Sequence, residues 1–178
     1  MIALSSRGLL LLFFFIGFLY IAPGALQPVA VEEKLEAPAN VTDKRIAFSF
    51  DDVPRGRGAF LEPEERPRLL IEALETSGIE QAVFFLNPGR ITANDNDAET
   101  VAAYAKAGHL LANHTADHSQ LSTTSVEKYL ADIDAAEEWL HGRAGYRPWF
   151  RYPYLDEGRQ DKGKRDAVRE GLAQRGLS

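Results

Sequence analysis

Residues 45–52 read RIAFSFDD, a short apolar run that begins after a basic residue and ends in two aspartates. Its length and composition are those of a buried strand, so we expect a strand over 45–50. The chain turns where a strand ends, so both carboxylates can reach one pocket, and a cation beside them would relieve their repulsion. Asp51 and Asp52 are therefore candidate functional residues, although a solvated strand-to-loop turn would also contain aspartate.

The rest of the chain alternates between the strand and the helix pattern. We expect further strands over 80–86, 109–113 and 148–152, and helices over 63–77, 97–107, 124–140 and 161–175. Local signals mark the ends of these helices. They are a capping box formed by Thr124 and Glu127, and the C-terminal glycines Gly78, Gly108 and Gly176.

Four strand–helix units in series predict an α/β fold with parallel strands and right-handed crossovers. An open doubly wound sheet and a (β/α) barrel both fit this count. In both, functional groups gather at the carboxyl ends of the strands, so a chemically active motif should directly follow a strand.

Two histidines follow the strand predicted over 109–113. His114 and His118 belong to the segment HTADH and are two of the four histidines in the chain. Imidazoles four residues apart can converge on one metal from a helical turn or a tight loop, although two surface histidines could share this spacing by chance. Glutamate does not follow His114, which excludes the zinc-protease pattern HExxH. His109 and His141 look incidental, one packed in a strand and the other near a helix C-terminus.

An arginine occupies the end of the fourth predicted strand, in FRYPY at 150–154. The Arg151 guanidinium can hold a carboxylate through two parallel hydrogen bonds and keep it ionised. An aromatic core strand with an arginine at its rim is the alternative.

The three segments together predict more than each one alone. Asp52, His114 and His118 offer one oxygen and two nitrogens, a ligand set that leaves coordination positions open for water and substrate, as in a catalytic site. Asp51 is then the candidate base, and Arg151 is available to orient it.

These segments resemble the polysaccharide deacetylase family, also called the NodB-homology or carbohydrate esterase family 4 domain. The resemblance covers roughly residues 45–175 and includes the segments between the motifs. FSFDDVP (48–54) resembles the first family motif, TFDDGP. HTADH (114–118) resembles the second motif, H-S/T-x-x-H, and RYPY (151–154) resembles the third, R-x-P-Y/F. The segments FFLN (84–87) and AGHLLANH (107–114) resemble the family's segments between these motifs.

The resemblance implies a distorted (β/α) barrel, of which about four βα units are present, and hydrolysis of N- or O-acetyl groups on a glycan. It implies that a divalent metal, usually Zn²⁺, is bound by Asp52, His114 and His118. It also implies that Asp51 is the general base.

The third motif carries two further implied roles. Tyr154 would offer its backbone N–H to the oxyanion, and Arg151 would position the base.

The sequence departs from the family at Val53, where glycine is common. It also lacks the fourth and fifth motifs, including a histidine that serves as general acid. We therefore expect a domain over 45–178 that is truncated at the C-terminus, with an unpaired parallel edge, uncovered apolar faces and poor solubility.

Composition narrows the functional classes. The net charge of −6, without a basic run, argues against a nucleic-acid partner, and the absence of cysteine excludes disulfides and thiolate ligands.

Residues 9–22 are almost purely apolar and follow a single arginine. We therefore expect a signal peptide over 1–30, with an uncleaved N-terminal anchor as the alternative. Residues 31–44 are interpreted as a linker.

The resulting prediction is an exported hydrolase, periplasmic or extracellular, that acts on carbon–nitrogen bonds other than peptide bonds in an acetylated polysaccharide. A membrane contact is expected only through an N-terminal anchor. Two alternatives remain: a non-catalytic exported fragment that binds metal or glycan, and a hydrolase of small amides on the same scaffold.

Overall fold

The computed structural model of the chain describes residues 45–91 and 97–178. The signal or anchor predicted for residues 1–30 and the linker predicted for 31–44 lie outside these ranges and remain predictions. None of the helices in the described residues is both long and apolar enough to cross a membrane.

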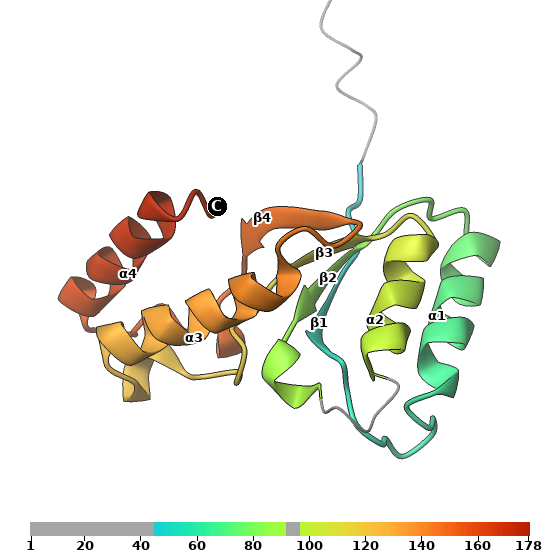
Figure 1. Cartoon of the computed structure of the whole chain (residues 1–178), viewed down its shortest axis with the longest axis horizontal. Helices are drawn as coiled ribbons and strands as arrows, with labels where there is room; N and C mark the ends of the chain where they lie inside the picture. Colours follow the sequence, from blue (N-terminus) through green and yellow to red (C-terminus); the bar gives the residue numbers. More distant parts are fainter. Residues whose placement is uncertain (1–44, 92–96) are drawn as a thin grey trace, which may run out of the picture. The chain divides into compact units, whose positions relative to one another are not determined.

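The described residues form a four-stranded parallel sheet whose strands lie in the order β1-β2-β3-β4 (Figure 1). The strands are β1 (Ser49–Val53), β2 (Val83–Leu86), β3 (Leu110–Asn113) and β4 (Tyr146–Phe150). The α-helices are α1 (Glu65–Thr76), α2 (Asp97–Lys106), α3 (Val126–Leu140) and α4 (Lys162–Gln174), and the short 3-10 helices are η1 (Pro88–Arg90), η2 (Leu121–Thr123) and η3 (Pro153–Leu155).

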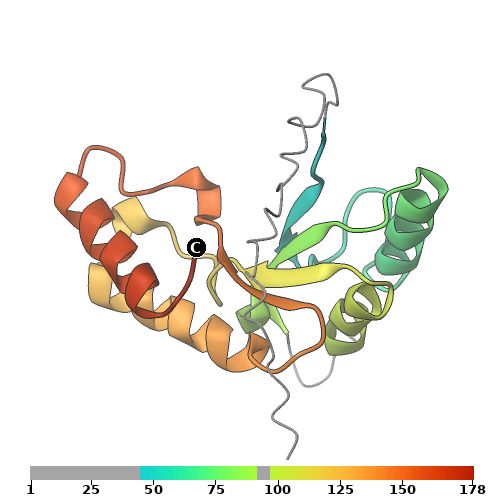
Figure 2. The ribbon, with the colours of Figure 1, turned by 90° about the horizontal axis from the view of Figure 1, so that it is seen from above.

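The strand order decides between the two architectures that the sequence left open. A doubly wound sheet reverses its order at a switch point, whereas consecutive strands of a (β/α) barrel are neighbours throughout. Here each strand pairs with the next one along the chain, and the helices follow one another around the outside of the curved sheet (Figure 2). The predicted barrel type, present as four βα units, is confirmed.

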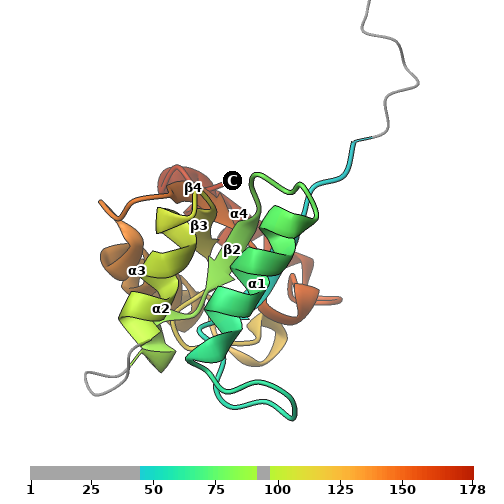
Figure 3. The same ribbon diagram turned by 90° about the vertical axis from the view of Figure 1, so that its right-hand side faces the viewer.

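Two apolar clusters hold the helices on the sheet. In the first, α1 and α2 lie side by side and pack with Phe84 and Leu86 of β2 (Figure 3). In the second, Tyr129 and Ile133 of α3 pack with Val168 of α4. The central strands β2 and β3 are almost wholly buried, which explains why their sequences are continuous apolar runs.

Apolar side chains are exposed at both outer edges of the sheet, as predicted. Phe48, just before β1, and Trp149 in β4 are 41% and 38% exposed. The expectation of an unpaired edge is only partly correct: β1 pairs with β2 alone among the described strands, but β4 has a neighbour on its outer side. Ser178 N donates to Pro148 O (3.1 Å) and Phe150 N donates to Ser178 O (2.8 Å).

Several predicted boundaries shift. The first strand is Ser49–Val53 rather than 45–50, so both aspartates lie inside β1, and the fourth is Tyr146–Phe150 rather than 148–152. The capping box of Thr124 and Glu127 is wrong: α3 begins one residue later, and Ser125 is the N-cap that accepts a hydrogen bond from Lys128 N.

The predicted C-terminal glycines are confirmed at α1, α2 and α4. Gly78, Gly108 and Gly176 follow these helices with φ angles of 70°, 91° and 69°. This left-handed conformation strains residues with a β-carbon.

Candidate metal site and active site

The two aspartates of β1 reach the same region because the strand is irregular there. Asp52 has a φ angle of 63°, in the left-handed region, and the register with β2 shifts between Phe50 and Val53. In a regular strand, adjacent side chains point to opposite faces. The irregularity therefore allows Asp51 to contact Arg151 of the β4 loop while Asp52 faces the histidines of the β3 loop.

The two histidines lie on the tight loop that follows β3. His114 comes directly after the strand, and the chain then takes left-handed conformations at Thr115 and at His118, each with a φ angle of 60°. Both histidine side chains are largely removed from solvent. Left-handed non-glycine residues cost about 1–3 kcal/mol each, so the loop must be held by its surroundings.

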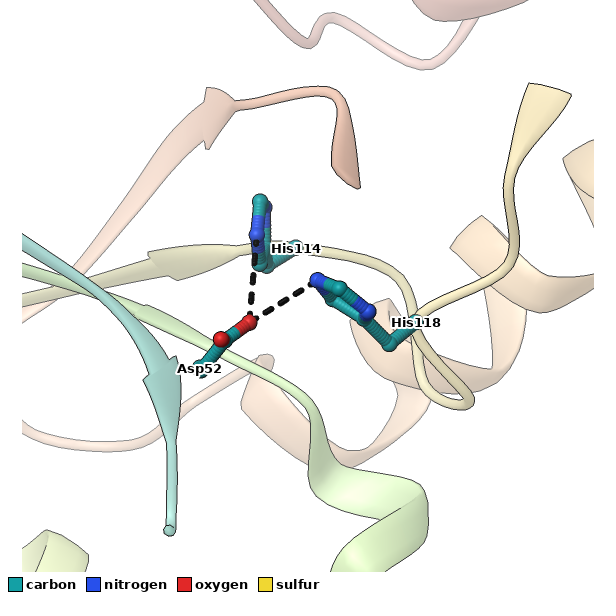
Figure 4. Close-up of side chains that lie close together, drawn as sticks. All are labelled: Asp52, His114 and His118. Atoms are coloured by element: carbon teal, nitrogen blue, oxygen red, sulfur yellow. Dashed lines mark ion pairs between the residues drawn. The ribbon is translucent and has the colours of Figure 1, made fainter. Parts of the chain in front are cut away.

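The side chains of Asp52, His114 and His118 point toward one another from β1 and the β3 loop (Figure 4). Asp52 Oδ1 lies 2.8 Å from His118 Nε2 and 3.7 Å from His114 Nε2. One ligand atom from each residue can be chosen so that all three lie within 4.8 Å of one another. Among the described residues, this is the group of histidines and acids with the spacing of a metal site.

A hydrogen bond outside this group determines which nitrogen of His114 faces the site. His114 Nδ1 lies 2.7 Å from the carbonyl oxygen of Arg151, so Nδ1 carries the proton and donates it. Nε2 is then left with a free lone pair directed toward Asp52. This is the arrangement in which an imidazole binds a metal.

Burial keeps both imidazoles neutral. Desolvation lowers the pKa of His114 below its usual value of 6.5, against the carbonyl of Arg151 and the nearby carboxylates, which raise it. Desolvation likewise lowers the pKa of His118, while Asp52 opposes the shift. Neutral imidazole is the form that ligates a metal.

The donor set fits a divalent cation. Oδ1 of Asp52 is buried and has no hydrogen-bond partner among the described residues, although His118 Nε2 is only 2.8 Å away. Arg55 reaches only the other carboxylate oxygen, Oδ2, at 3.7 Å, so a cation beside Oδ1 would supply the positive charge that this oxygen lacks. Two nitrogens and one oxygen form a set that binds zinc and leaves positions open.

Asp51 is held by Arg151 across the sheet. Arg151 Nη1 donates to Asp51 Oδ1 and to Ser49 Oγ, each at 2.8 Å. The guanidinium carbon lies 4.1 Å from the centroid of the Phe85 ring. The expected pair of parallel hydrogen bonds does not form, because one nitrogen is shared between two oxygens while stacking on Phe85 orients the group.

Tyr154 lies beside the histidines. Its backbone is left-handed, with a φ angle of 58°, and its ring centroid is 4.5 Å from that of His118. The side chain is exposed and forms one wall of a hollow of about 580 Å³. The other residues of this hollow are mostly polar or charged: Gln120, Leu155, Asp156, Glu157, Arg159, Arg165 and Arg169.

The remaining histidines belong to the scaffold. His109 is buried just before β3, against Phe84, and its Nδ1 accepts a hydrogen bond from Ala82 N at 3.4 Å. His141 is the C-cap of α3, as its position near a helix C-terminus predicted. Neither belongs to the group of candidate metal ligands.

Three buried polar residues that brace the histidine loop were missed by the sequence reasoning. Asn113 Oδ1 accepts a hydrogen bond from Thr115 N at 2.7 Å, and Asp132 Oδ1 accepts one from Asp117 N at 2.8 Å. Asn87 Nδ2 donates to the carbonyls of His114 and Thr115. Asn87 directly follows β2, so the rule that functional residues follow strands could have identified it.

The geometry agrees with three comparisons with known proteins. The family model described as polysaccharide deacetylase matches residues 39–174. Two proteins of Bacillus cereus, both named peptidoglycan-N-acetylglucosamine deacetylase, are similar in sequence. One is 30% identical over 110 residues, which are 61% of this chain and 36% of that protein. The other is 31% identical over 120 residues, which are 67% of this chain and 47% of that protein.

A solved structure shows the same fold. The family 4 carbohydrate esterase of Streptomyces lividans, in complex with acetate, matches with a TM-score of 0.56 and 25% sequence identity over 75% of this chain and 59% of that one. The chain spans less than half the length of the two Bacillus relatives.

Proposed function

Because the chain belongs to the polysaccharide deacetylase family, we propose that it carries the metal site of a hydrolase that removes acetyl groups from an N- or O-acetylated polysaccharide. The observation that carries this proposal is the convergence of Asp52, His114 and His118 next to the Asp51–Arg151 pair. Names of the relatives favour an N-acetylated glycan.

The metal, which we propose to be Zn²⁺, would be held by Asp52, His114 and His118. When bound, it would act as a Lewis acid toward the acetyl carbonyl and make a water molecule more acidic. Each protein ligand has a distinct part in holding it: the aspartate supplies charge, and the buried imidazoles supply neutral nitrogen donors.

Asp51 is the proposed general base. It takes a proton from the attacking water, whose oxygen bonds to the acetyl carbon. The C–N or C–O bond of the acetyl group then breaks, and the proton held by Asp51 passes to the leaving nitrogen or oxygen. The products are acetate and a free amine or hydroxyl. Arg151 holds the carboxylate of Asp51 in place through a hydrogen bond of 2.8 Å.

Tyr154 is proposed to stabilise the charge that develops on the acetyl oxygen. A backbone N–H directed at this oxygen binds it more strongly in the transition state than in the ground state. The left-handed backbone at Tyr154 is a position where strain is commonly retained for function. The polar hollow beside Tyr154 offers a surface suited to sugar hydroxyls.

Export is part of the proposal. The apolar run at residues 9–22 supports a signal peptide or an N-terminal anchor, and a polysaccharide substrate of the cell envelope would be met outside the cytoplasm.

The proposal is tested with two adjacent substitutions. Asp51→Asn should abolish acetate release from chito-oligosaccharides while zinc binding persists, and Asp52→Asn should reduce zinc binding itself. Glu62→Gln, which changes an exposed acid paired with Arg57, is the control and should alter neither. Undiminished turnover in Asp51→Asn would refute the role of the base, and hydrolysis of small cyclic amides instead of glycans would favour the alternative substrate class.

A further inference from the structure

We propose that Asn87 is a positioning residue of the metal site, because its side chain fixes the loop that carries the histidines to the end of β2. Asn87 lies outside the three motifs that carry the proposed ligands. The inference rests on the proposed function in one respect, namely that Asp52, His114 and His118 bind a metal.

The side chain of Asn87 is fully buried and its donor group is used twice. Nδ2 donates to the carbonyl oxygen of His114 at 2.6 Å and to that of Thr115 at 3.0 Å. Oδ1 has no hydrogen-bond partner among the described residues. The orientation of the amide follows from the chemistry, because rotation by half a turn would place Oδ1 against two carbonyl oxygens.

The contacts of Asn87 join the two segments that supply the ligands. Its backbone N donates to Val53 O at 2.7 Å, next to Asp52 in β1, while its side chain holds the carbonyl of His114. Arg90 Nη1 reaches the carbonyl oxygen of Asp52 at 3.5 Å. The turn that begins at Asn87 therefore bridges the aspartate ligand and the first histidine ligand.

The histidine loop needs such a bridge. Thr115 and His118 are both held in left-handed conformations, which ordinary residues leave unless their surroundings fix them. The carbonyls held by Asn87 lie at the start of this turn. Without the amide, two buried carbonyl oxygens lose a donor, and the loop gains freedom to rotate His114 away from Asp52.

The experiment compares metal affinity with stability in the full chain. Asn87→Ala removes the amide, Asn87→Asp keeps its shape but replaces the donor with oxygen, and Val101→Ala on α2 is the control for loss of buried volume. Co²⁺ binding is followed by its visible absorption, Zn²⁺ binding by competition with a chelator, and folding by thermal unfolding of the metal-free protein.

We expect Asn87→Ala and Asn87→Asp to weaken Co²⁺ and Zn²⁺ binding by about 10–100-fold, the usual effect of residues that orient metal ligands, and to alter the Co²⁺ spectrum. Val101→Ala should lower the unfolding temperature while metal affinity stays within about twofold. If Asn87→Ala does not fold, Asn87→Ser, which keeps one donor, should show an intermediate loss.

Two outcomes overturn the inference and can be told apart. Equal metal affinity in the wild type and the folded Asn87 variants would leave the metal site intact and reduce Asn87 to a structural residue. A wild-type chain that binds neither Co²⁺ nor Zn²⁺ would overturn the metal site of the proposed function together with this inference.

Discussion

His118 Nε2 lies 2.8 Å from Asp52 Oδ1, although one residue lies on the loop after β3 and the other in β1. The oxygen nevertheless has no hydrogen-bond partner among the described residues, and burial favours the neutral imidazole. A cation ligated by both atoms would supply the positive charge that this carboxylate oxygen lacks. This pair is therefore the most informative contact of the site.

Asp52→Asn should weaken Zn²⁺ binding by at least about 100-fold, because the substitution removes the only anionic ligand of the set. Titration against a chelator measures the loss. In the metal-free protein the same substitution removes one partner of a long, partly exposed ion pair with Arg55 (3.7 Å), so the thermal unfolding temperature should change little. Unchanged zinc affinity would contradict the assignment of Asp52 as a ligand.

Arg151→Ala should lower kcat by about 10–100-fold while zinc affinity changes little. The side chain holds Asp51, whereas His114 is held by the backbone carbonyl of Arg151, which any residue supplies. Acetate release and chelator competition measure the two effects separately. Arg147→Ala, an exposed change in β4, is the matched control, and a parallel loss of zinc in Arg151→Ala would show that its side chain has another role.

Metal affinity should depend on pH with a midpoint below the usual histidine value of about 6.5. Burial lowers the pKa of His114 and His118, so protons compete with the metal only at more acidic pH. We expect Zn²⁺ affinity to be nearly constant above about pH 6.5 and to fall below it.

The same shifts predict the pH dependence of stability. The unfolded chain binds protons at these histidines more readily than the folded chain. The contribution of these histidines, and of His109, whose pKa burial also lowers, to the free energy of unfolding of the metal-free protein is therefore fully present above the unfolded pKa. It is lost as the pH drops through the lower folded pKa. Urea unfolding at several pH values measures this slope. A wild-type protein with no slope below about pH 6.5 would contradict the burial argument.

Gly89→Ala should destabilise the protein by about 1–3 kcal/mol. A β-carbon at this position would lie 2.8 Å from the carbonyl oxygen of Ala116, and the backbone N of Gly89 already donates to that oxygen. The histidine loop would have to move away from η1. Gly56→Ala, with no atom within 4 Å of the added carbon, should change the unfolding free energy by less than about 0.5 kcal/mol, and equal effects would refute the close-approach argument.

The sequence predicted the elements well because local signals were strong. The apolar runs of β2 and β3 and the glycines after α1 and α2 fixed the type of each element. Boundaries were less certain: Thr124 and Ser125 are adjacent capping residues, and the structure uses Ser125, which has the stronger preference for the N-cap.

The candidate site was predicted in part for a related reason. Asp51, Asp52, His114, His118 and Arg151 all lie near the carboxyl ends of strands, and parallel strands bring these ends to one edge. Their proximity follows from topology alone. The shared nitrogen of Arg151 could not be predicted, because Ser49 competes for it only once β1 and β4 have been placed by the sheet.

The sequence by itself determined which groups are candidates for the proposed chemistry: one oxygen and two nitrogens as proposed metal ligands, no thiolates, and a proposed base with an arginine partner, on consecutive strand–helix units. The tertiary structure alone decided how these groups meet. The left-handed turn at Asp52, the tautomer of His114 and the bridge made by Asn87 depend on contacts between distant segments. Residue type and periodicity determine the local structure and the chemical groups of each segment. The direction of the His114 lone pair, in contrast, depends on how several segments pack together.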